Sequence, residues 1–309
     1  MSEPLTLEPR GPFSLAAAAG FAFGPNEGRA PAFDGAMRLA FPIDGGEGYA
    51  GVVARQPLEH GPVRCEVHGG GDLALVERQI ARVLSLDHDG NAFLAVGERD
   101  GVIGELQRGH PGQRPVLFHS PYEAAAWSVI SARRQPTQAA AVRRGLGVAL
   151  GQTFELGGQP LVAFPQPERL LETVELAGVG AEKSERLRAV AGSALEGALD
   201  VASLHAMGPE AAWSALQDLP GIGPFYAGLI VLRAAGFADA PMPMAEPRIL
   251  AHAARFYGLP EPPTLEQFSE LALAWRPFRT WTAVLLRLAG DREFGRDGAG
   301  GARRGSSGA

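Results

Sequence analysis

Residues 217–250 read QDLPGIGPFYAGLIVLRAAGFADAPMPMAEPRIL, and this stretch decides the fold. The segment Leu219–Pro224 separates two apolar runs that have helical spacing. Gly221 and Gly223 allow the backbone to adopt positive φ and to approach another molecule closely. The amides that open the second helix lack intrahelical partners and carry the positive end of the helix dipole, which suits a phosphate oxygen. The glycines alone are equally consistent with an ordinary corner between two helices.

The second helix is followed by a loop that contains Pro241, Pro243 and Glu246. Glu246 precedes Pro247, and an acid followed by proline is typical of a helix N-terminus. This order of helix, glycine turn, helix, proline-containing loop and carboxylate resembles the signature of the helix-hairpin-helix DNA glycosylase superfamily. The resemblance implies that the turn binds the DNA backbone and that the loop presents a carboxylate to the sugar of a flipped nucleotide. The family uses Asp at this position, whereas this chain has Glu246.

Further segments resemble the same superfamily and follow one another in the family's order. They are residues 86–93, 120–135, 164–170, 177–191 and 274–286. The resemblance is strongest to the 3-methyladenine DNA glycosylase II type. It implies a mostly helical fold, in which a small N-terminal α+β domain with an antiparallel sheet precedes two helical lobes.

The periodicity of the chain agrees with this division into domains. Short alternating runs favour strands at Phe13–Leu15, Met37–Phe41, Tyr49–Arg55 and Pro62–His68, followed by a helix over Leu73–Leu84. We expect an N-terminal α+β domain over residues 1–88, the two-lobed helical domain over 89–295 with its hairpin at 217–226, and a disordered tail over 296–309.

Two local signals predict where helices of the second domain begin. The acids of segment 86–89 fit a helix cap better than a calcium loop, because no closing Glu stands at the required position. Ser120 is expected to cap a helix whose buried face includes Tyr122, Val129 and Ile130.

The net charge of −6 opposes DNA binding, because the overall field repels phosphate. The arginines are unevenly distributed, however. Residues 101–150 contain six Arg and two Glu, and residues 276–309 contain seven Arg and three acidic residues. This asymmetry favours local contacts with DNA, although arginine pairs on a helix also occur on a simple solvated face.

The single cysteine, Cys65, excludes an internal disulfide and a cysteine cluster for zinc or iron–sulfur. We expect no required cofactor. The first 20 residues do not have the pattern of a signal peptide, and no apolar run reaches the length of a membrane span. We therefore expect a cytoplasmic protein that acts away from membranes and without an obligate protein partner.

Cleavage of an N-glycosidic bond passes through an oxocarbenium-like transition state, which an anion close to the sugar stabilises. The resemblance places Glu246 in this catalytic role. Asp239 is the only nearby Asp, but it lies before the Met-Pro-Met turn and out of register. Bifunctional relatives use a Lys nucleophile two residues after the second hairpin glycine. Phe225 occupies that position here, which excludes lyase chemistry through it.

The resemblance places four side chains in the pocket for the flipped base. Phe225 stands where close relatives have a pocket aromatic residue, Tyr226 follows it, and Leu229 lies one helical turn further on. Arg287 stands where a pocket Trp is expected. An aromatic pocket binds cationic alkylated bases by cation–π contacts, and Arg287 opposes such binding. Arg287 is instead able to pair with Glu246.

Three groups of residues are expected to contact the DNA backbone or the base stack. The phosphate-binding residues are Gly221, Gly223 and Pro224. The backbone carbonyls of Gln217, Leu219 and Ile222 are expected to hold a monovalent cation, Na⁺ or K⁺, that bridges to a phosphate. Arg133 or Arg134 would fill the gap left by the extruded base, and an exposed basic turn is equally consistent with these two arginines.

The sequence thus predicts a monofunctional DNA glycosylase of base-excision repair that acts on damaged, alkylated-type bases in duplex DNA. A non-catalytic or weakly active DNA-damage-binding homologue is the first alternative, because Glu246, Arg287 and Arg133 depart from the family pattern. A helical protein that binds no nucleic acid is the second, because the net charge is negative.

Overall fold

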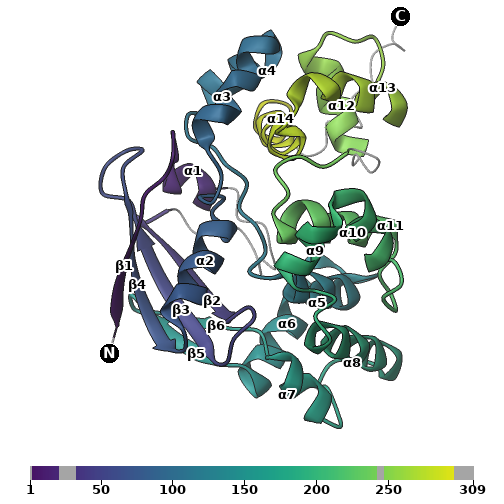
Figure 1. Ribbon diagram of the computed structural model, residues 1–309. Coiled ribbons are helices and arrows are strands. Elements are labelled where there is room, and N and C mark those ends of the chain that lie inside the picture. The colour runs from purple at the N-terminus through teal and green to yellow at the C-terminus, as the bar shows by residue number, and fades with distance from the viewer. Residues whose placement is uncertain (1, 21–32, 242–246, 296–309) are drawn as a thin grey trace, which may run out of the picture.

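The computed structural model describes residues 2–20, 33–241 and 247–295. An antiparallel sheet forms one side of the molecule, and two groups of helices pack beside it, one above the other in Figure 1. The mostly helical architecture with a small sheet confirms the predicted fold class. Within the described residues, no helix combines the length and the apolar character needed to cross a membrane.

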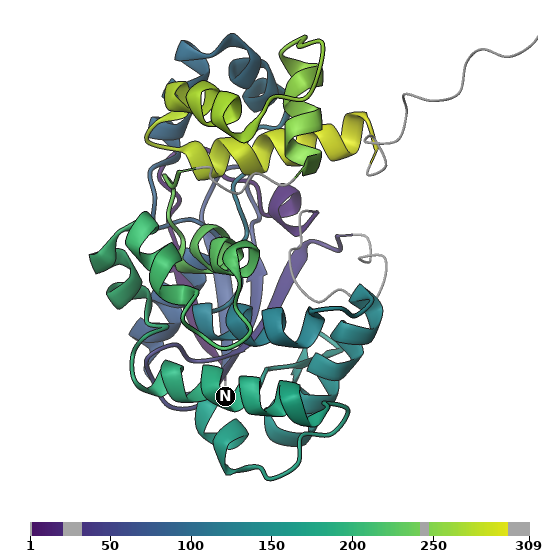
Figure 2. The ribbon, with the colours of Figure 1, turned by 90° about the vertical axis from the view of Figure 1, so that its right-hand side faces the viewer.

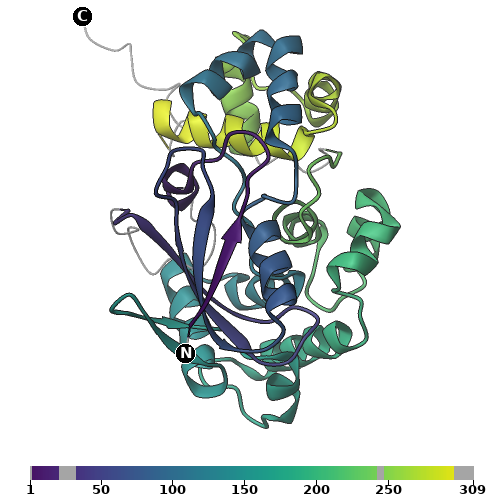
Figure 3. The ribbon, with the colours of Figure 1, turned by 60° about the vertical axis from the view of Figure 1, so that its left-hand side comes forward.

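The sheet lies at the N-terminal end of the chain (Figure 3). Its spatial order is β1 (Glu3–Leu7), β4 (Val63–Gly70), β3 (Tyr49–Arg55) and β2 (Ala36–Pro42), with every pair antiparallel. Side chains alternate between the two faces. One face, which includes Leu39 and Val52, packs on α1 (Leu15–Ala19) and on α2 (Leu73–Val83).

A hairpin from the helical part of the chain, β5 (Thr153–Leu156) and β6 (Gln159–Val162), covers the other face of the sheet at β2 and β3. Phe154 lies against β3 so closely that a Cβ atom on Gly51 would stand 2.6 Å from its ring. Glycine at position 51 therefore makes room for the hairpin.

The first helical lobe has one continuous core. It is built from α5 (Pro121–Ser131), α6 (Pro136–Leu150), α7 (Pro167–Glu172), α8 (Ala181–Leu195), α9 (Val201–Met207), α10 (Pro209–Leu216), α11 (Pro224–Ile230) and the π-helical turn η1 (Val231–Ala235). The predicted buried face of α5 is confirmed, since Tyr122, Val129 and Ile130 are buried.

The second helical lobe joins two distant parts of the sequence. Helices α3 (Gly90–Arg99) and α4 (Gly101–Gly109) pack on α12 (Pro247–Phe256), α13 (Leu265–Leu271), the 3-10 helix η2 (Ala272–Trp275) and α14 (Arg279–Glu293). Figure 2 shows this lobe above the first one, with α14 running across its base. Trp275 and Trp281 are buried in its core.

Local sequence signals give most element boundaries correctly. Ser120 Oγ accepts a hydrogen bond from the Glu123 N–H (3.0 Å), and the Asp89 side chain accepts one from the Asn91 N–H (2.8 Å), so both predicted caps are confirmed. The predicted strand at Phe13–Leu15 is wrong. Ser14 instead caps α1, because its Oγ accepts a hydrogen bond from the Ala17 N–H.

A buried arginine fixes the N-terminal loop against the second helical lobe. The Arg114 side chain is 1% exposed, and its guanidinium stacks near Trp281. It donates hydrogen bonds to the backbone carbonyls of Arg10, Gly11, Pro12, Ser85 and His88. Burial lowers the pKa of Arg114 to about 10, so the side chain keeps its charge at neutral pH.

A second buried ionic group lies at the start of α5. Glu123 is 4% exposed, and its carboxylate lies 3.2 Å from His119 Nδ1 and 2.8 Å from an Arg143 guanidinium nitrogen. Burial by itself raises the pKa of Glu123, but His119 and Arg143 outweigh that effect and lower the pKa to about 2.

Candidate functional site

The turn between α10 and α11 has the sharp geometry that its glycines predict. Gly221 has φ +88°, and the Ile222 N–H donates to the Leu219 carbonyl (3.0 Å). Ile222 is buried and anchors the turn in the core of the first lobe. Gly223 has φ −87° and ψ −178°, an extended conformation open to any residue. Of the two glycines, only Gly221 therefore uses the positive φ that glycine allows at both positions.

The outer surface of this turn exposes backbone. Gly221, Gly223 and Pro224 are exposed, and no side chain among the described residues caps α11. Pro224 has no N–H, and the Ala227 N–H donates to the Gly223 carbonyl (2.9 Å). The amides of Phe225 and Tyr226 are thus the first donors of the helix.

Three carbonyls predicted to hold a cation belong to the same turn. They are those of Gln217, which follows the last residue of α10, of Leu219 and of Ile222. Neutral backbone carbonyls are the oxygen donors that a weakly charged alkali cation accepts, and the Leu219 oxygen keeps a second lone pair beside its bond to Ile222. The chemistry of this donor set fits a monovalent cation.

A second turn with the same backbone geometry precedes α8. Gly178 has φ +74°, and the Val179 N–H donates to the Leu176 carbonyl (3.0 Å). Gly180 is extended, and the Ser184 N–H donates to its carbonyl (2.9 Å). Residues 176–181 read LAGVGA and residues 219–224 read LPGIGP, so the spacing Leu-x-Gly-x-Gly is the sequence signal that identifies this repeat.

Helix α8 follows the second turn and contacts the first one. A Cβ atom on Gly221 would stand 2.9 Å from Arg186 Cδ, so Arg186 lies directly against the turn before α11. One turn earlier on α8, Lys183 Nζ donates hydrogen bonds to the carbonyls of Ile130 (3.0 Å) and Ala132 (2.6 Å) at the end of α5. Sequence reasoning did not identify Lys183 or Arg186, because only the tertiary fold brings α8 to these positions.

The predicted wedge residues differ in their surroundings. Arg133 is exposed and has φ +56°, a left-handed conformation that is unusual for a residue with a side chain. Arg134 is partly buried and donates a hydrogen bond to the Gly178 carbonyl (3.1 Å). We call Arg133, Arg134, Lys183 and Arg186 the basic surface.

The predicted pocket residues of α11 lie beside the turn. Phe225 is 60% exposed, and its ring contacts Tyr226 edge to face with centroids 5.4 Å apart. The Tyr226 hydroxyl lies 3.4 Å from Ser131 Oγ, which belongs to the end of α5. Leu229 is partly buried against the core of the first lobe. The structure thus places Phe225 and Tyr226 near the turn that carries Arg133.

The two candidate carboxylates are in different situations. Asp239 accepts three hydrogen bonds from Arg279, two from the guanidinium (2.8 and 2.9 Å) and one from the backbone N–H (3.1 Å). Both Asp239 oxygens therefore accept hydrogen bonds that fix the start of α14. Glu246 lies outside the described residues, and α12 begins immediately after it at Pro247.

Arg287 lies in a cluster of charged residues between α12 and α14. Its guanidinium is 4.0 Å from Asp291, which also contacts Arg248 (3.5 Å) and His252 (3.1 Å). The proximity of Arg287 adds to the effect of burial in lowering the pKa of Arg233 to about 9. Because Glu246 lies outside the described residues, the pairing of Arg287 with Glu246 stays a prediction.

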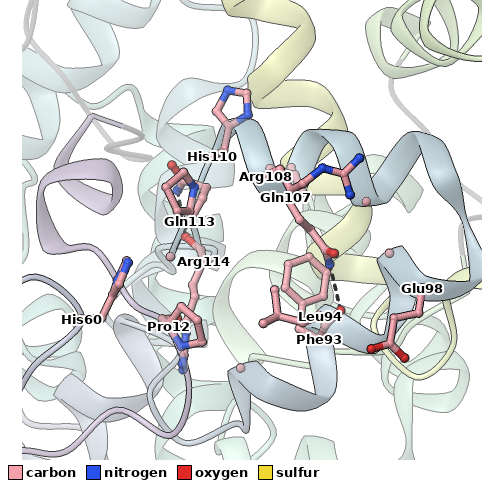
Figure 4. Close-up of a pocket in the computed structure, with 16 residues that line it drawn as sticks. Pro12, His60, Phe93, Leu94, Glu98, Gln107, Arg108, His110, Gln113 and Arg114 are labelled. Atoms are coloured by element: carbon pink, nitrogen blue, oxygen red, sulfur yellow. Dashed lines mark hydrogen bonds between the residues drawn. The ribbon is translucent and has the colours of Figure 1, made fainter.

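A separate cavity of about 490 Å³ lies between the N-terminal domain and the α3–α4 pair. Figure 4 shows His60 and Gln113 on one side of it, with Phe93, Leu94 and Glu98 on the other. None of the predicted site residues that the structure describes lines this cavity.

Comparison with known proteins finds similar proteins that are named DNA glycosylases, although no family model matches the chain. A DNA-3-methyladenine glycosylase of Bacillus subtilis (strain 168) is 23% identical over 215 residues, which cover 68% of this chain and 71% of that protein. The solved structure of a 3-methyladenine DNA-glycosylase from Archaeoglobus fulgidus has a TM-score of 0.72 at 22% identity, covering 94% of this chain and 99% of the other.

A Clostridium acetobutylicum 8-oxoguanine glycosylase/lyase, solved in complex with double-stranded DNA containing cytosine opposite 8-oxoguanine, has a TM-score of 0.61 at 15% identity, with coverages of 95% and 98%. At these identities the two solved structures establish the fold.

Proposed function

We propose that this chain, which has the fold of the helix-hairpin-helix DNA glycosylase superfamily, is a monofunctional DNA glycosylase that releases damaged, alkylated-type bases from duplex DNA. The observation that carries this proposal is the exposed turn at Gly221, with Arg186 against it and the amides that open α11 beside it. This arrangement provides backbone amides and positive charge for a phosphate. The reaction is a hydrolysis and requires no cofactor.

Binding begins at the DNA backbone. Gly221, Gly223 and Pro224 let the phosphate approach the turn closely, since none of them presents a bulky side chain. The carbonyls of Gln217, Leu219 and Ile222 would hold a monovalent cation that supplies further positive charge beside the phosphate. The basic surface offsets the net charge of −6 where the DNA lies.

The damaged base must leave the stack before its bond to the sugar can be cleaved. Arg133 is the residue we assign to the vacated space, because it is exposed whereas Arg134 is bonded to Gly178. The extruded base would stack on Phe225, whose exposed ring offers a free face. Tyr226, Leu229 and Arg287 would form further walls of the pocket.

Glu246 is assigned the catalytic role. Its carboxylate would stabilise the positive charge that develops on the sugar and would orient the attacking water. Asp239 is unsuited to this role because its oxygens already bind Arg279. Phe225 replaces the lysine of bifunctional enzymes, so the product is an intact abasic strand rather than a cleaved one.

The test is base release from duplex DNA that carries methylated or deaminated bases, with the wild type compared with Glu246→Gln. We expect the wild type to release free base and leave abasic sites, and Glu246→Gln to lose this activity while it still binds DNA. Glu261→Gln, an exposed change of the same kind, is the matched control and should behave as the wild type. Binding of damaged duplex without release by the wild type would instead support the damage-binding alternative.

A further inference from the structure

The chain has 28 Lys and Arg residues, and Lys183 is the only lysine among them. It lies in the first turn of α8, and its ammonium group donates to two carbonyls at the end of α5, those of Ile130 and Ala132. A compact ammonium can donate to two convergent carbonyls, whereas the planar guanidinium of arginine is larger and directs its donors in a fixed fork. Lys183 makes both bonds from its single nitrogen.

The turn that Lys183 holds is the one that carries Arg133. The backbone leaves α5 at Ala132 (φ −50°, ψ 121°) and enters the left-handed region at Arg133 (φ +56°). Lys183 binds the carbonyl on one side of Arg133, and Arg134, on the other side, binds Gly178 of the turn before α8. A left-handed conformation is unfavourable for a residue with a side chain, so it persists only where its surroundings fix it.

The placement of Lys183 is electrostatically unfavourable for the protein alone. Burial, followed by the charges of Arg134, Arg186 and Arg133, lowers the pKa of the Lys183 ammonium, and only Glu182 opposes these effects. A neutral hydrogen-bond donor could satisfy the same carbonyls without adding a positive charge to three arginines. A bound polyanion would relieve this repulsion. A charged residue at position 183 is therefore consistent with a turn that contacts DNA.

We propose that Lys183 is a positioning residue for base extrusion, which fixes the turn 132–134 so that Arg133 can occupy the space vacated by the damaged base. This inference rests on the proposed function. Loss of Lys183 should therefore slow base extrusion and excision much more than it weakens binding to DNA that already lacks the base.

The experiment compares the wild type with Lys183→Met and Lys183→Arg on two duplexes. One carries a damaged base next to 2-aminopurine, whose fluorescence reports unstacking, and the other carries a stable abasic analogue. We expect Lys183→Met to slow extrusion and single-turnover excision at least tenfold, roughly the cost of a misplaced catalytic or positioning group. Affinity for the abasic duplex should fall less than about threefold, as for the loss of one backbone contact.

Lys183→Arg separates charge from geometry. It keeps the positive charge, so we expect wild-type affinity for the abasic duplex together with only partial recovery of the extrusion rate. The matched control is Arg188→Met. Arg188 also lies on α8 and donates to two carbonyls, those of Thr173 and Val174, but at the end of α7. This control loses the same charge and the same number of bonds, and it should extrude the base at the wild-type rate.

A measurement on the unaltered protein covers the case in which Lys183→Met does not fold. Because the chain has one lysine, selective ¹³C labelling of lysine gives a single ε-methylene resonance in NMR spectra. We expect this resonance to shift when the abasic duplex binds. An unchanged resonance, or equal extrusion by wild type and Lys183→Met, would overturn the inference. If the wild type neither binds nor excises, the proposed function itself fails.

Discussion

Arg186 lies directly against Gly221, with its Cδ atom 2.9 Å from the position that a Cβ atom on residue 221 would occupy. Gly221 also has φ +88°. Gly221→Ala therefore strains the backbone and displaces Arg186. We expect a loss of about 1–2 kcal/mol in the free energy of unfolding and weaker binding to duplex DNA, measured by chemical denaturation and fluorescence anisotropy. Gly223→Ala is the matched comparison. Gly223 has negative φ and no heavy atom within 4 Å of its Cβ position, so this change should leave stability unaltered.

Asp239→Asn should lower the stability of the fold, whereas Glu246→Gln should lower the rate of excision. Asp239→Asn removes a charge from the pair with Arg279 and should lower the free energy of unfolding by about 2 kcal/mol, the typical scale for a charged hydrogen-bond pair. Excision should then fall only in proportion to the folded fraction. Glu246→Gln should lower the single-turnover rate without moving the melting temperature. An excision defect in fully folded Asp239→Asn as large as that of Glu246→Gln would reassign the catalytic carboxylate.

Phe225→Ala should affect function without affecting stability. The side chain is 60% exposed, and exposed positions typically change the free energy of unfolding by less than about 0.5 kcal/mol. Loss of a stacking face should lower base release by roughly tenfold or more, given the usual value of base–aromatic stacking. Leu58→Ala, which removes a 69% exposed side chain from the N-terminal domain, should alter neither property. Unchanged release by Phe225→Ala would remove Phe225 from the pocket.

Glu123 should make stability depend on pH in the acid range. Its folded-state pKa of about 2 lies below the ordinary glutamate value of 4.5, so the unfolded state binds the proton more readily. The stabilising contribution is complete above pH 4.5 and is lost as the pH falls toward 2. Glu123→Gln should flatten this part of the profile of free energy of unfolding against pH, measured by denaturation between pH 2 and 6. An equally steep profile in the variant would show that other carboxylates cause the loss.

The sequence predicts the features that depend on neighbouring residues. Ser120 and Asp89 cap helices because their side chains reach amides two or three residues away, and Gly221 bends the chain by its own φ. The contacts of Arg186 with Gly221 and of Lys183 with the end of α5 join residues about 35 to 53 positions apart. No local pattern encodes such contacts.

The same reason explains why the second face of the sheet was not predicted to be covered by β5 and β6. Their residues follow α6, far from the strands that they cover. The roles assigned to Glu246, Phe225 and Arg287 remain predictions from the resemblance, which the variants above test.

The second helical lobe has a consequence for how the protein is made. Helices α3 and α4 bury Phe93 and Ile103 in a core that they share with α12–α14, which the ribosome synthesises more than 130 residues later. During translation these apolar side chains stay exposed to solvent, chaperones and proteases until the last part of the chain has been synthesised. Premature termination before α12 would therefore leave α3 and α4 without the other half of their lobe, and such a fragment should be rapidly degraded in the cell.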